Sequence, residues 1–183
     1  KVDFSLGSGL FVETRGEFQL TGELVEQVNV NIENYVGYMK NISQVVMGSP
    51  DIEQYLFGEG EAVREQAKER LEMEFQSVLR IRKDISNIAL LWKGGHHFVN
   101  SSKEEWNPYA RLDEKAWFQK AKECGEQAYI SSSHVQNMIK GRYDWVVTMS
   151  HGLANPHTGE VEGMLLIDLN YNVINDLCEA VRL

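Results

Sequence analysis

The sequence contains little that would tie the chain together covalently or anchor it in a membrane. Two cysteines, Cys124 and Cys178, form no Cys-x-x-Cys pair and are too few for a disulfide scaffold. One bridge between them stays open as an alternative, although two separate half-buried thiols are the simpler expectation. No stretch approaches the roughly 20 apolar residues of a membrane span, and no signal-peptide pattern is visible.

The chain also lacks an excess of basic residues. Its 18 Lys and Arg stand against 27 Asp and Glu, which gives a net charge of −9. Binding to phosphate groups needs clustered Lys and Arg, so nucleic acid and anionic lipid are both disfavoured as partners. The first residues are Lys1 and Val2 rather than Met, and we expect the chain to be an excised piece of a longer protein.

What the chain does have is an ordinary globular composition, 43% hydrophobic and 25% charged, which is enough to bury a core. Its 183 residues fit one domain, or one domain with a helical appendage. Residues 1–16 are mixed and punctuated by glycine, and we expect them to form a loose lead-in with a short strand over 10–13.

Apolar residues then recur at helical spacing. Steps of three or four residues continue over seven positions, which are Leu24, Val28, Ile32, Tyr35, Met39, Ile42 and Val46. The pattern predicts a helix over 17–47 with this stripe buried, a short helix over 51–57 after Gly48-Ser49-Pro50, and a second amphipathic helix over 61–84. Helices of this composition need tertiary packing to hold them.

Beyond residue 84 the apolar period changes towards two, which indicates strands. Five are expected, over 86–93, 96–100, 128–133, 143–150 and 161–169. Gly94-Gly95 predicts a hairpin turn between the first two. A short helix over 114–123 precedes the third strand, and a closing helix begins at Asn170.

This order of elements predicts an α+β fold, with long N-terminal helices packed on a five-stranded antiparallel sheet. The connections are hairpins or short loops, which disfavours a doubly wound parallel sheet. We expect residues 1–84 to form the lead-in and helical segment, and residues 85–183 to form the sheet subdomain.

Four segments stand in a characteristic order, and they are NIENYVGYMKNISQVVMGSPDIEQYL, RIRKDISNIALLWKGG, DEKAWFQKAKECG and EVEGMLLIDLNYNVINDLC. In this order they resemble a Cache domain, the PAS-like extracellular sensor module of bacterial receptors. More narrowly, they are similar to the sensor region of YesM-type two-component histidine kinases. The resemblance covers residues 17–183, nearly the whole chain.

The resemblance implies an extracytoplasmic, non-enzymatic domain that binds a small molecule and passes the signal through its long helix. The membrane spans and the kinase would lie outside this chain, and a homodimer is compatible with it. A ligand that prefers one of two conformations would shift their populations. Two alternatives stay open: a small hydrolytic enzyme, which needs an acid–base pair in a cleft, and a non-binding dimerisation spacer.

Asp168 follows the apolar run Met164-Leu165-Leu166-Ile167, although a buried carboxylate costs several kcal/mol unless it is paired or hydrogen-bonded. Alternation places it on the face of Met164 and Leu166, while the aliphatic residues of the other face suit the long helices. The resemblance implies that an acid here holds a ligand's ammonium group. The alternative is a structural carboxylate bonded to backbone amides. We predict that Asp168 opens on the ligand site, so that Asp168→Ala removes binding at little cost to the apo fold.

Arg111, Trp117 and Phe118 form a second candidate group. In amino-acid-binding members, the resemblance implies an Arg that clamps the ligand carboxylate and a Trp-Tyr pair that walls the pocket. Here five residues separate Arg111 from Trp117, which is wider than that motif, and Phe118 stands in place of the Tyr. The amino-acid pattern is therefore broken. A solvated Arg and a core Trp are the alternative.

Tyr129, Tyr143, Trp145 and His151 form a third group, on or beside the later strands. Aromatic walls with a few polar tips describe a sugar or small-molecule site, in which His151 would be a polar tip. We expect Asp168 to lie near Tyr143 or Trp145 and the Trp117 segment. Core packing is the alternative for Trp145.

The sequence gives little support for a metal site or a catalytic site. His96 and His97 are adjacent on a strand, so they point to opposite faces, and no third ligand stands at zinc spacing. No GxSxG, P-loop or HExxH motif is present. We therefore expect no metal and no cofactor.

Overall fold

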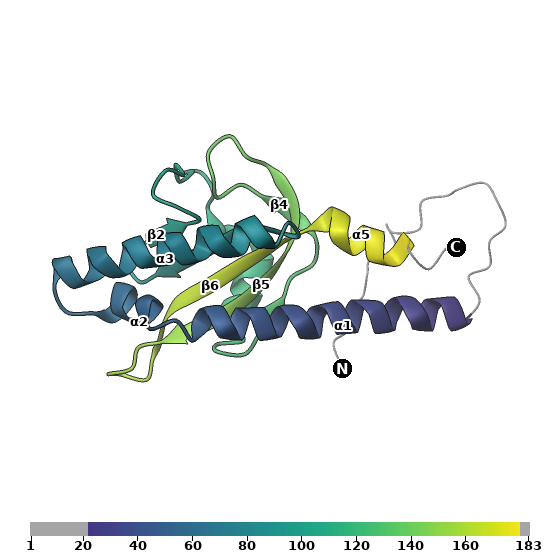
Figure 1. Ribbon diagram of the computed structural model, residues 1–183, viewed down its shortest axis with the longest axis horizontal. Coiled ribbons are helices and arrows are strands. Elements are labelled where there is room, and N and C mark those ends of the chain that lie inside the picture. Colours follow the sequence, from purple (N-terminus) through teal and green to yellow (C-terminus); the bar gives the residue numbers. More distant parts are fainter. Residues whose placement is uncertain (1–21, 180–183) are drawn as a thin grey trace.

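The computed structural model describes residues 22–179 and confirms the α+β architecture (Figure 1). Three helices precede the sheet: α1 (Gly22–Met47), α2 (Pro50–Phe57) and α3 (Glu61–Ile81). A 3-10 turn, η1 (Leu112–Glu114), and α4 (Ala116–Glu123) lie between the second and third strands, and α5 (Tyr171–Glu179) follows the last strand. The strand predicted over 10–13 lies outside the described residues.

The described strands form one sheet, antiparallel throughout. They are β1 (Ile85–Trp92), β2 (His96–Val99), β3 (Tyr129–Ile130), β4 (His134–Gln136), β5 (Asp144–Ala154) and β6 (Val161–Asn170). The order across the sheet is β2-β1-β6-β5-β3, and β4 also pairs with β5. Because β1 and β5 flank it on both sides, β6 is the central strand.

The hairpin prediction is confirmed. β1 and β2 pair antiparallel, and the connecting Gly94 and Gly95 have φ angles of 86° and 80°. Residues with a Cβ disfavour such angles, so the turn favours glycine. The five-strand prediction missed β4, since three residues are too few to show a period. It also ended β5 at residue 150, whereas the strand continues to Ala154.

α1, α2 and α3 pack on one face of the sheet, which we call the long-helix face. Their largest buried side chains are Met39 of α1 and Leu71 and Phe75 of α3. The sheet contributes Ile85, Ile88, Leu90, Phe98, Met149, Leu153, Leu165, Ile167 and Leu169. Burying one such side chain contributes about 1.5–3 kcal/mol, so this apolar layer holds the helices on the sheet.

The predicted stripe of α1 is confirmed only in part. Ile32 and Met39 are buried, whereas Leu24 and Val28, which were expected to be buried, are half-exposed. The helix has 26 residues and is about 39 Å long. Its N-terminal half projects past the end of the sheet and runs beside α5 (Figure 1), so the sheet does not cover it.

Two polar contacts fix the position of α1. The Tyr35 hydroxyl donates to the Asp84 carboxylate at 2.7 Å, and Arg82 forms an ion pair with the same group. Burial favours a higher pKa for Asp84, but the hydrogen bonds from Arg82 and Tyr35 outweigh it, so the pKa is lowered. Further along α1, Oγ of Ser43 lies 2.7 Å from Nε2 of His151 on β5.

Candidate functional site

The other face of the sheet, which we call the α4 face, carries a second apolar cluster. Trp117 and Phe118 of α4 pack there against Met164 and Leu166 of β6. The even-numbered residues of β6 thus face α4, and its odd-numbered residues face the long helices. This confirms the alternation predicted from the sequence and places Asp168 on the α4 face.

Asp168 is fully buried, and three side chains donate hydrogen bonds to its carboxylate. Thr148 Oγ1 donates to Oδ1 at 2.7 Å, and Gln136 Nε2 donates to the same oxygen at 3.3 Å. Asn87 Nδ2 donates to Oδ2 at 3.1 Å. The donors come from β5, β4 and β1, so side chains of three strands hold the carboxylate, and not the backbone amides of a strand–helix corner.

A second amide supports this network from behind. Asn100 Nδ2 donates to Asn87 Oδ1 at 3.0 Å, and Asn100 Oδ1 accepts from the backbone N–H of Ile88 at 2.8 Å. Asn100 has a φ of 53°, in the left-handed region that Asn adopts more readily than most residues. These bonds fix the Asn87 amide with its NH₂ group towards Asp168.

His134 of β4 covers the network from the side of α4. Its ring is stacked on Trp117, with centroids 4.4 Å apart and planes 21° apart. Its Nε2 lies 3.2 Å from Thr148 Oγ1, and its Nδ1 lies 3.0 Å from the carbonyl oxygen of Ser132. A chain of polar contacts therefore leads from His134 through Thr148 to Asp168.

The donors and acceptors of this chain make His134 and Asp168 share one proton. The Ser132 carbonyl can only accept, so Nδ1 of His134 carries a hydrogen. If Thr148 donates to an ionised Asp168, His134 must donate from Nε2 and is a cation. If Asp168 is protonated and donates to Thr148, the hydroxyl donates to a neutral His134. Either arrangement leaves the pair without net charge.

Burial shifts the pKa values of both partners. It raises the pKa of Asp168, against the effect of the three hydrogen bonds that the carboxylate accepts. It lowers the pKa of His134, against the effect of the hydrogen bond to Ser132. Burial therefore acts against the charged form of each partner, while the hydrogen bonds to the carboxylate and to Ser132 act in favour of those forms.

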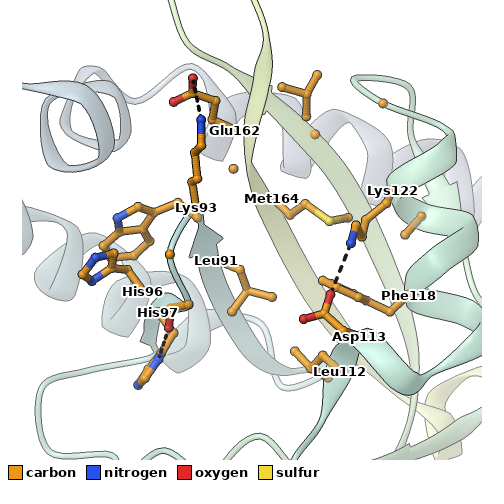
Figure 2. A pocket seen from close by; sticks show the side chains of 18 of the residues that line it. Leu91, Lys93, His96, His97, Leu112, Asp113, Phe118, Lys122, Glu162 and Met164 are labelled. Carbon is orange, nitrogen blue, oxygen red and sulfur yellow. Dashed lines mark hydrogen bonds and ion pairs between the residues drawn. The ribbon is translucent and has the colours of Figure 1, made fainter.

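An open pocket of about 710 Å³ lies on the same face, at the end of the sheet where β1 turns into β2 (Figure 2). Small-molecule sites have volumes of about 300–1,000 Å³. Leu91 and Met164 form its floor, and Leu112 and Phe118 line the side towards α4. Asp168 follows Met164 by four residues, roughly 13 Å along the strand, and does not line this pocket.

The wall of the pocket carries charges of both signs, arranged in pairs. Lys93 Nζ lies 4.0 Å from Glu162 Oε1, and Lys122 Nζ lies 3.2 Å from Asp113 Oδ1. The first pair joins the β1–β2 hairpin to β6, and the second joins α4 to η1. Figure 2 shows the two pairs on opposite sides of the apolar floor.

The β1–β2 hairpin adds aromatic rings to the wall. Trp92 stacks with His96, with centroids 5.4 Å apart, and His97 stacks with Trp106 at 4.2 Å. The two adjacent histidines thus contact different tryptophans. Within residues 22–179, no group of three His, Cys, Asp or Glu side chains is placed to hold a metal ion.

Gly152 of β5 lets the loop after α4 close the pocket. Its backbone N–H donates to the carbonyl of Gly125 at 2.8 Å. A Cβ at Gly152 would lie 2.5 Å from that oxygen, closer than real Cβ atoms approach. The missing side chain therefore sets how near this loop comes to the sheet.

Besides Asp168 and Phe118, three further candidate site residues lie on the α4 face. Trp117 is buried against His134, and Tyr129 is half-buried beside the cluster that contains Trp117. Arg111 lines the pocket from η1, where its side chain is exposed and forms an ion pair with Glu114 at 3.2 Å. Of the residues predicted for the site, only Arg111 and Phe118 line the open pocket.

Tyr143 and Trp145 do not wall the site. Tyr143 is 66% exposed and Trp145 is 59% exposed, and the nearest ring to Trp145 is that of Tyr171 in α5. Trp145 is odd-numbered in β5, whereas Thr148, which contacts Asp168, is even-numbered. Alternation therefore turns Trp145 away from the acid, and the prediction that Asp168 lies near these rings is wrong.

His151 also lies on the wrong face for a polar tip of the pocket. It occupies an odd-numbered position of β5, like the core residue Met149, and meets Ser43 of α1. Its pKa is lowered by burial, against a backbone hydrogen bond with Glu126. Cys124 differs from expectation too, since it is exposed rather than half-buried.

Sequence reasoning missed the partners of Asp168. These are Asn87, Gln136, Thr148 and His134. A signal for two of them was present, because Asn87 and Thr148 are polar residues inside otherwise apolar strands. Each is the direct cross-strand partner of Asp168 in the sheet register.

No protein-family model matches the chain, and no curated protein matches it. Solved structures do match. The ligand-binding domain of the Campylobacter jejuni chemoreceptor Tlp3, in complex with L-norvaline, has a TM-score of 0.63 at 15% identity, over 85% of this chain and 59% of that one. The ligand-binding domain of the Pseudomonas fluorescens chemoreceptor CtaA, in complex with L-isoleucine, has a TM-score of 0.58 at 11% identity, over 85% and 57%. The extracellular domain of vpHK1S-Z8, described as a histidine kinase, has a TM-score of 0.63 at 14% identity, over 86% and 58%.

These similarities show that the chain has the fold of sensory ligand-binding domains. The chain spans less than two thirds of the length of each of these structures, between 57% and 59%. Among its described helices, none has the length and the apolar character to pass through a bilayer.

Proposed function

We propose that this chain is the extracytoplasmic sensor domain of a bacterial transmembrane receptor and that it binds a small molecule on the α4 face. The observation that carries the proposal is the 710 Å³ pocket between the sheet and α4, opposite a face that the long helices cover. A ligand-sensing domain needs a concave surface for the ligand and a rigid element that responds to it. The two faces of this sheet supply one each.

The receptor type follows from the sequence resemblance. The segments similar to YesM-type sensors favour a histidine kinase as the parent protein, with membrane spans outside the residues described. The described pocket supports no catalytic role. Within residues 22–179, the chain His134–Thr148–Asp168 joins an imidazole, a hydroxyl and a carboxylate. Thr148 is fully buried and its hydroxyl contacts both neighbours, so no substrate reaches it.

The signal has a short path to α1. A ligand in the pocket would contact Leu91 of β1 and Met164 of β6, and a tighter pocket would shift β6. At the far end of β6, the backbone N–H of Asn170 donates to the carbonyl of Asp84 at 2.8 Å, and the Asp84 side chain holds Tyr35 of α1. A ligand that prefers one position of β6 would thereby shift the population of α1 positions.

A thermal-shift screen of sugars, amino acids, carboxylates and peptides tests the proposal. A ligand at 100 times its dissociation constant stabilises by about 2.7 kcal/mol. Leu91→Trp fills the floor of the pocket and should remove the shift, whereas Val135→Trp, on exposed β4, should retain it. If no compound stabilises the protein, or if Leu91→Trp keeps the full shift, the pocket is not a sensor site and the spacer alternative is favoured.

A further inference from the structure

We infer that the pocket takes an uncharged, hydroxyl-rich ligand with an apolar face, such as a saccharide, and not the amino acids bound by the chemoreceptors of this fold. The inference rests on the proposed function, because it names the chemistry of the molecule that the sensor would bind. Three features of the pocket carry it: the balance of its charges, the pairing of those charges, and its apolar floor.

The charges that line the pocket balance. The lining has three cationic side chains, Lys93, Arg111 and Lys122, and three acidic ones, Asp113, Glu160 and Glu162. A ligand with a net charge gains nothing from a neutral lining, although it loses its hydration on entering the pocket. A phosphate, a dicarboxylate or a polyamine is therefore a poor fit.

The pairing excludes zwitterions as well. Each lysine has an acid within 4.0 Å, so a ligand carboxylate that approaches Lys93 or Lys122 also meets the repulsion of Glu162 or Asp113. Arg111, the remaining cation, is exposed and already paired with Glu114 at 3.2 Å.

The buried acid that the sequence resemblance offers for an ammonium group is out of reach. Asp168 is fully buried, does not line the pocket and already accepts three hydrogen bonds. Glu160, the one lining acid without an ion pair among the described residues, is exposed, so water screens its attraction for an ammonium group.

Hydroxyl groups suit the same pairs. A hydroxyl both donates and accepts, so beside a Lys–Glu pair it can accept from the ammonium and donate to the carboxylate. Hydrogen bonds to ionised groups are stronger than neutral ones. The pairs Lys93–Glu162 and Lys122–Asp113 lie on opposite sides of the floor (Figure 2), so a ligand with hydroxyls at both ends could use both.

The floor requires an apolar face on the ligand. Leu91, Met164 and Phe118 present hydrocarbon between the two ion pairs, and the stacked rings of His97 and Trp106 stand beside them. The C–H face of a sugar ring can pack on such a surface while its hydroxyls reach the rim. A wholly apolar ligand would instead remove water from both ion pairs and would offer no hydrogen bonds in place of those to water.

Calorimetric titration of the chain tests the inference. The probes are glucose, galactose, maltose and cellobiose, with glucuronate, glucosamine and L-isoleucine as charged counterparts, each up to about 10 mM, where even a millimolar site is largely filled. We expect a neutral sugar to bind, with an affinity that changes less than about twofold between low and high salt. Glu162→Gln should weaken that binding about tenfold by removing a charge-assisted acceptor. Glu123→Gln, exposed on α4 outside the lining, is the matched control and should change nothing.

A gain of binding sharpens the test. Asp113→Asn leaves the lining with one net positive charge, so glucuronate should bind this variant at least about fivefold more tightly than it binds the wild type. If L-isoleucine or glucuronate binds the wild-type pocket and Leu91→Trp removes that binding, the inference is overturned while the proposed function stands. If none of the neutral sugars binds, the inference is overturned, and the broader screen then decides the proposed function separately.

Discussion

The two faces of the sheet share the same strands and the same alternation, yet they are built differently. On the long-helix face, β6 presents Leu165, Ile167 and Leu169 to a continuous apolar core. On the α4 face, the same strand presents Met164 to an open pocket, Leu166 to a small cluster and Asp168 to a polar network. One face is closed by apolar packing, and the other is divided along its length into open, apolar and polar parts.

The difference explains why an apolar strand admits an acid. Asp168 sits where its face has already become polar, and its three donors come from neighbouring strands. A carboxylate buried with this many donors avoids most of the cost of an unpaired charge. The same acid one position earlier, at Ile167, would face the apolar long-helix core.

The largest expected contrast comes from truncating β6 on either face. Ile167→Ala should destabilise by about 3–4 kcal/mol, because a closed core cannot fill the cavity. Met164→Ala should cost only about 2 kcal/mol, because part of that side chain already borders the open pocket. Urea unfolding of both variants measures the difference. Equal losses would show that the pocket is closed in solution.

Asp168→Ala gives the next largest effect. The sequence pattern predicts little cost to the apo fold, but in the structure three buried side chains donate to this carboxylate and would lose their acceptor. A buried donor left unsatisfied costs about 1–3 kcal/mol, so we expect a total loss of about 2–4 kcal/mol. Denaturant unfolding checks this, with the exposed Asp113→Ala as a control that should stay within about 0.5 kcal/mol of wild type. A loss below that level for Asp168→Ala would contradict the network.

Tyr35→Phe probes the attachment of α1 and should cost about 1.5–2 kcal/mol, because it removes a hydrogen bond to an ionised carboxylate. Burial and the bond to Asp84 both raise the pKa of Tyr35, as expected for a hydroxyl held as a donor. Tyr38→Phe keeps the ring that lies under Arg82 and should be nearly silent. Thermal unfolding measures the stability of both variants. Equal losses for Tyr35→Phe and Tyr38→Phe would contradict a stabilising bond between Tyr35 and Asp84.

The smallest expected effect is the loss of stability at acidic pH. Burial lowers the pKa of His151 from its ordinary value of 6.5, with Lys40 acting in the same direction, so the folded state binds this proton less readily than the unfolded chain. The stability that the neutral ring contributes is complete above about pH 6.5 and is lost as the pH falls through the folded pKa. We expect the free energy of unfolding to fall on acidification across this range. His151→Gln should make the profile shallower and leave the contribution of His134, whose pKa burial also lowers, whereas His157→Gln, in the exposed turn before β6, should leave its shape unchanged.

The long-range layout of the fold was largely predictable, because it depends on periodicity. The stripe of α1, the glycine turn after β1 and the alternation of β6 all come from local pattern. The three-residue β4 does not, and it supplies both Gln136 and His134 to the Asp168 network. A short strand is stabilised by pairing with its neighbour, and its own sequence shows little strand pattern.

The site was predictable only as far as alternation was applied. It placed Asp168 on the correct face of the sheet, because that residue was argued from its position in the strand, although the acid does not line the pocket. Trp145 and His151 were chosen by residue type, and their odd positions in β5 put them on the other face from Thr148. The partners Asn87 and Thr148 depend on the pairing of β1 and β5 with β6, a register that a single sequence does not contain.

The direct passage from β6 into α5 has a geometric consequence. β6 ends at Asn170 and α5 begins at Tyr171, so no linker residue separates the central strand from the helix that contacts α1. An α-helix turns by about 100° and rises about 1.5 Å for each residue. One alanine inserted between Asn170 and Tyr171 would therefore turn a different side of α5 towards α1 and leave the pocket unchanged. The number of residues at this junction therefore sets the rotation of α5 about its own axis.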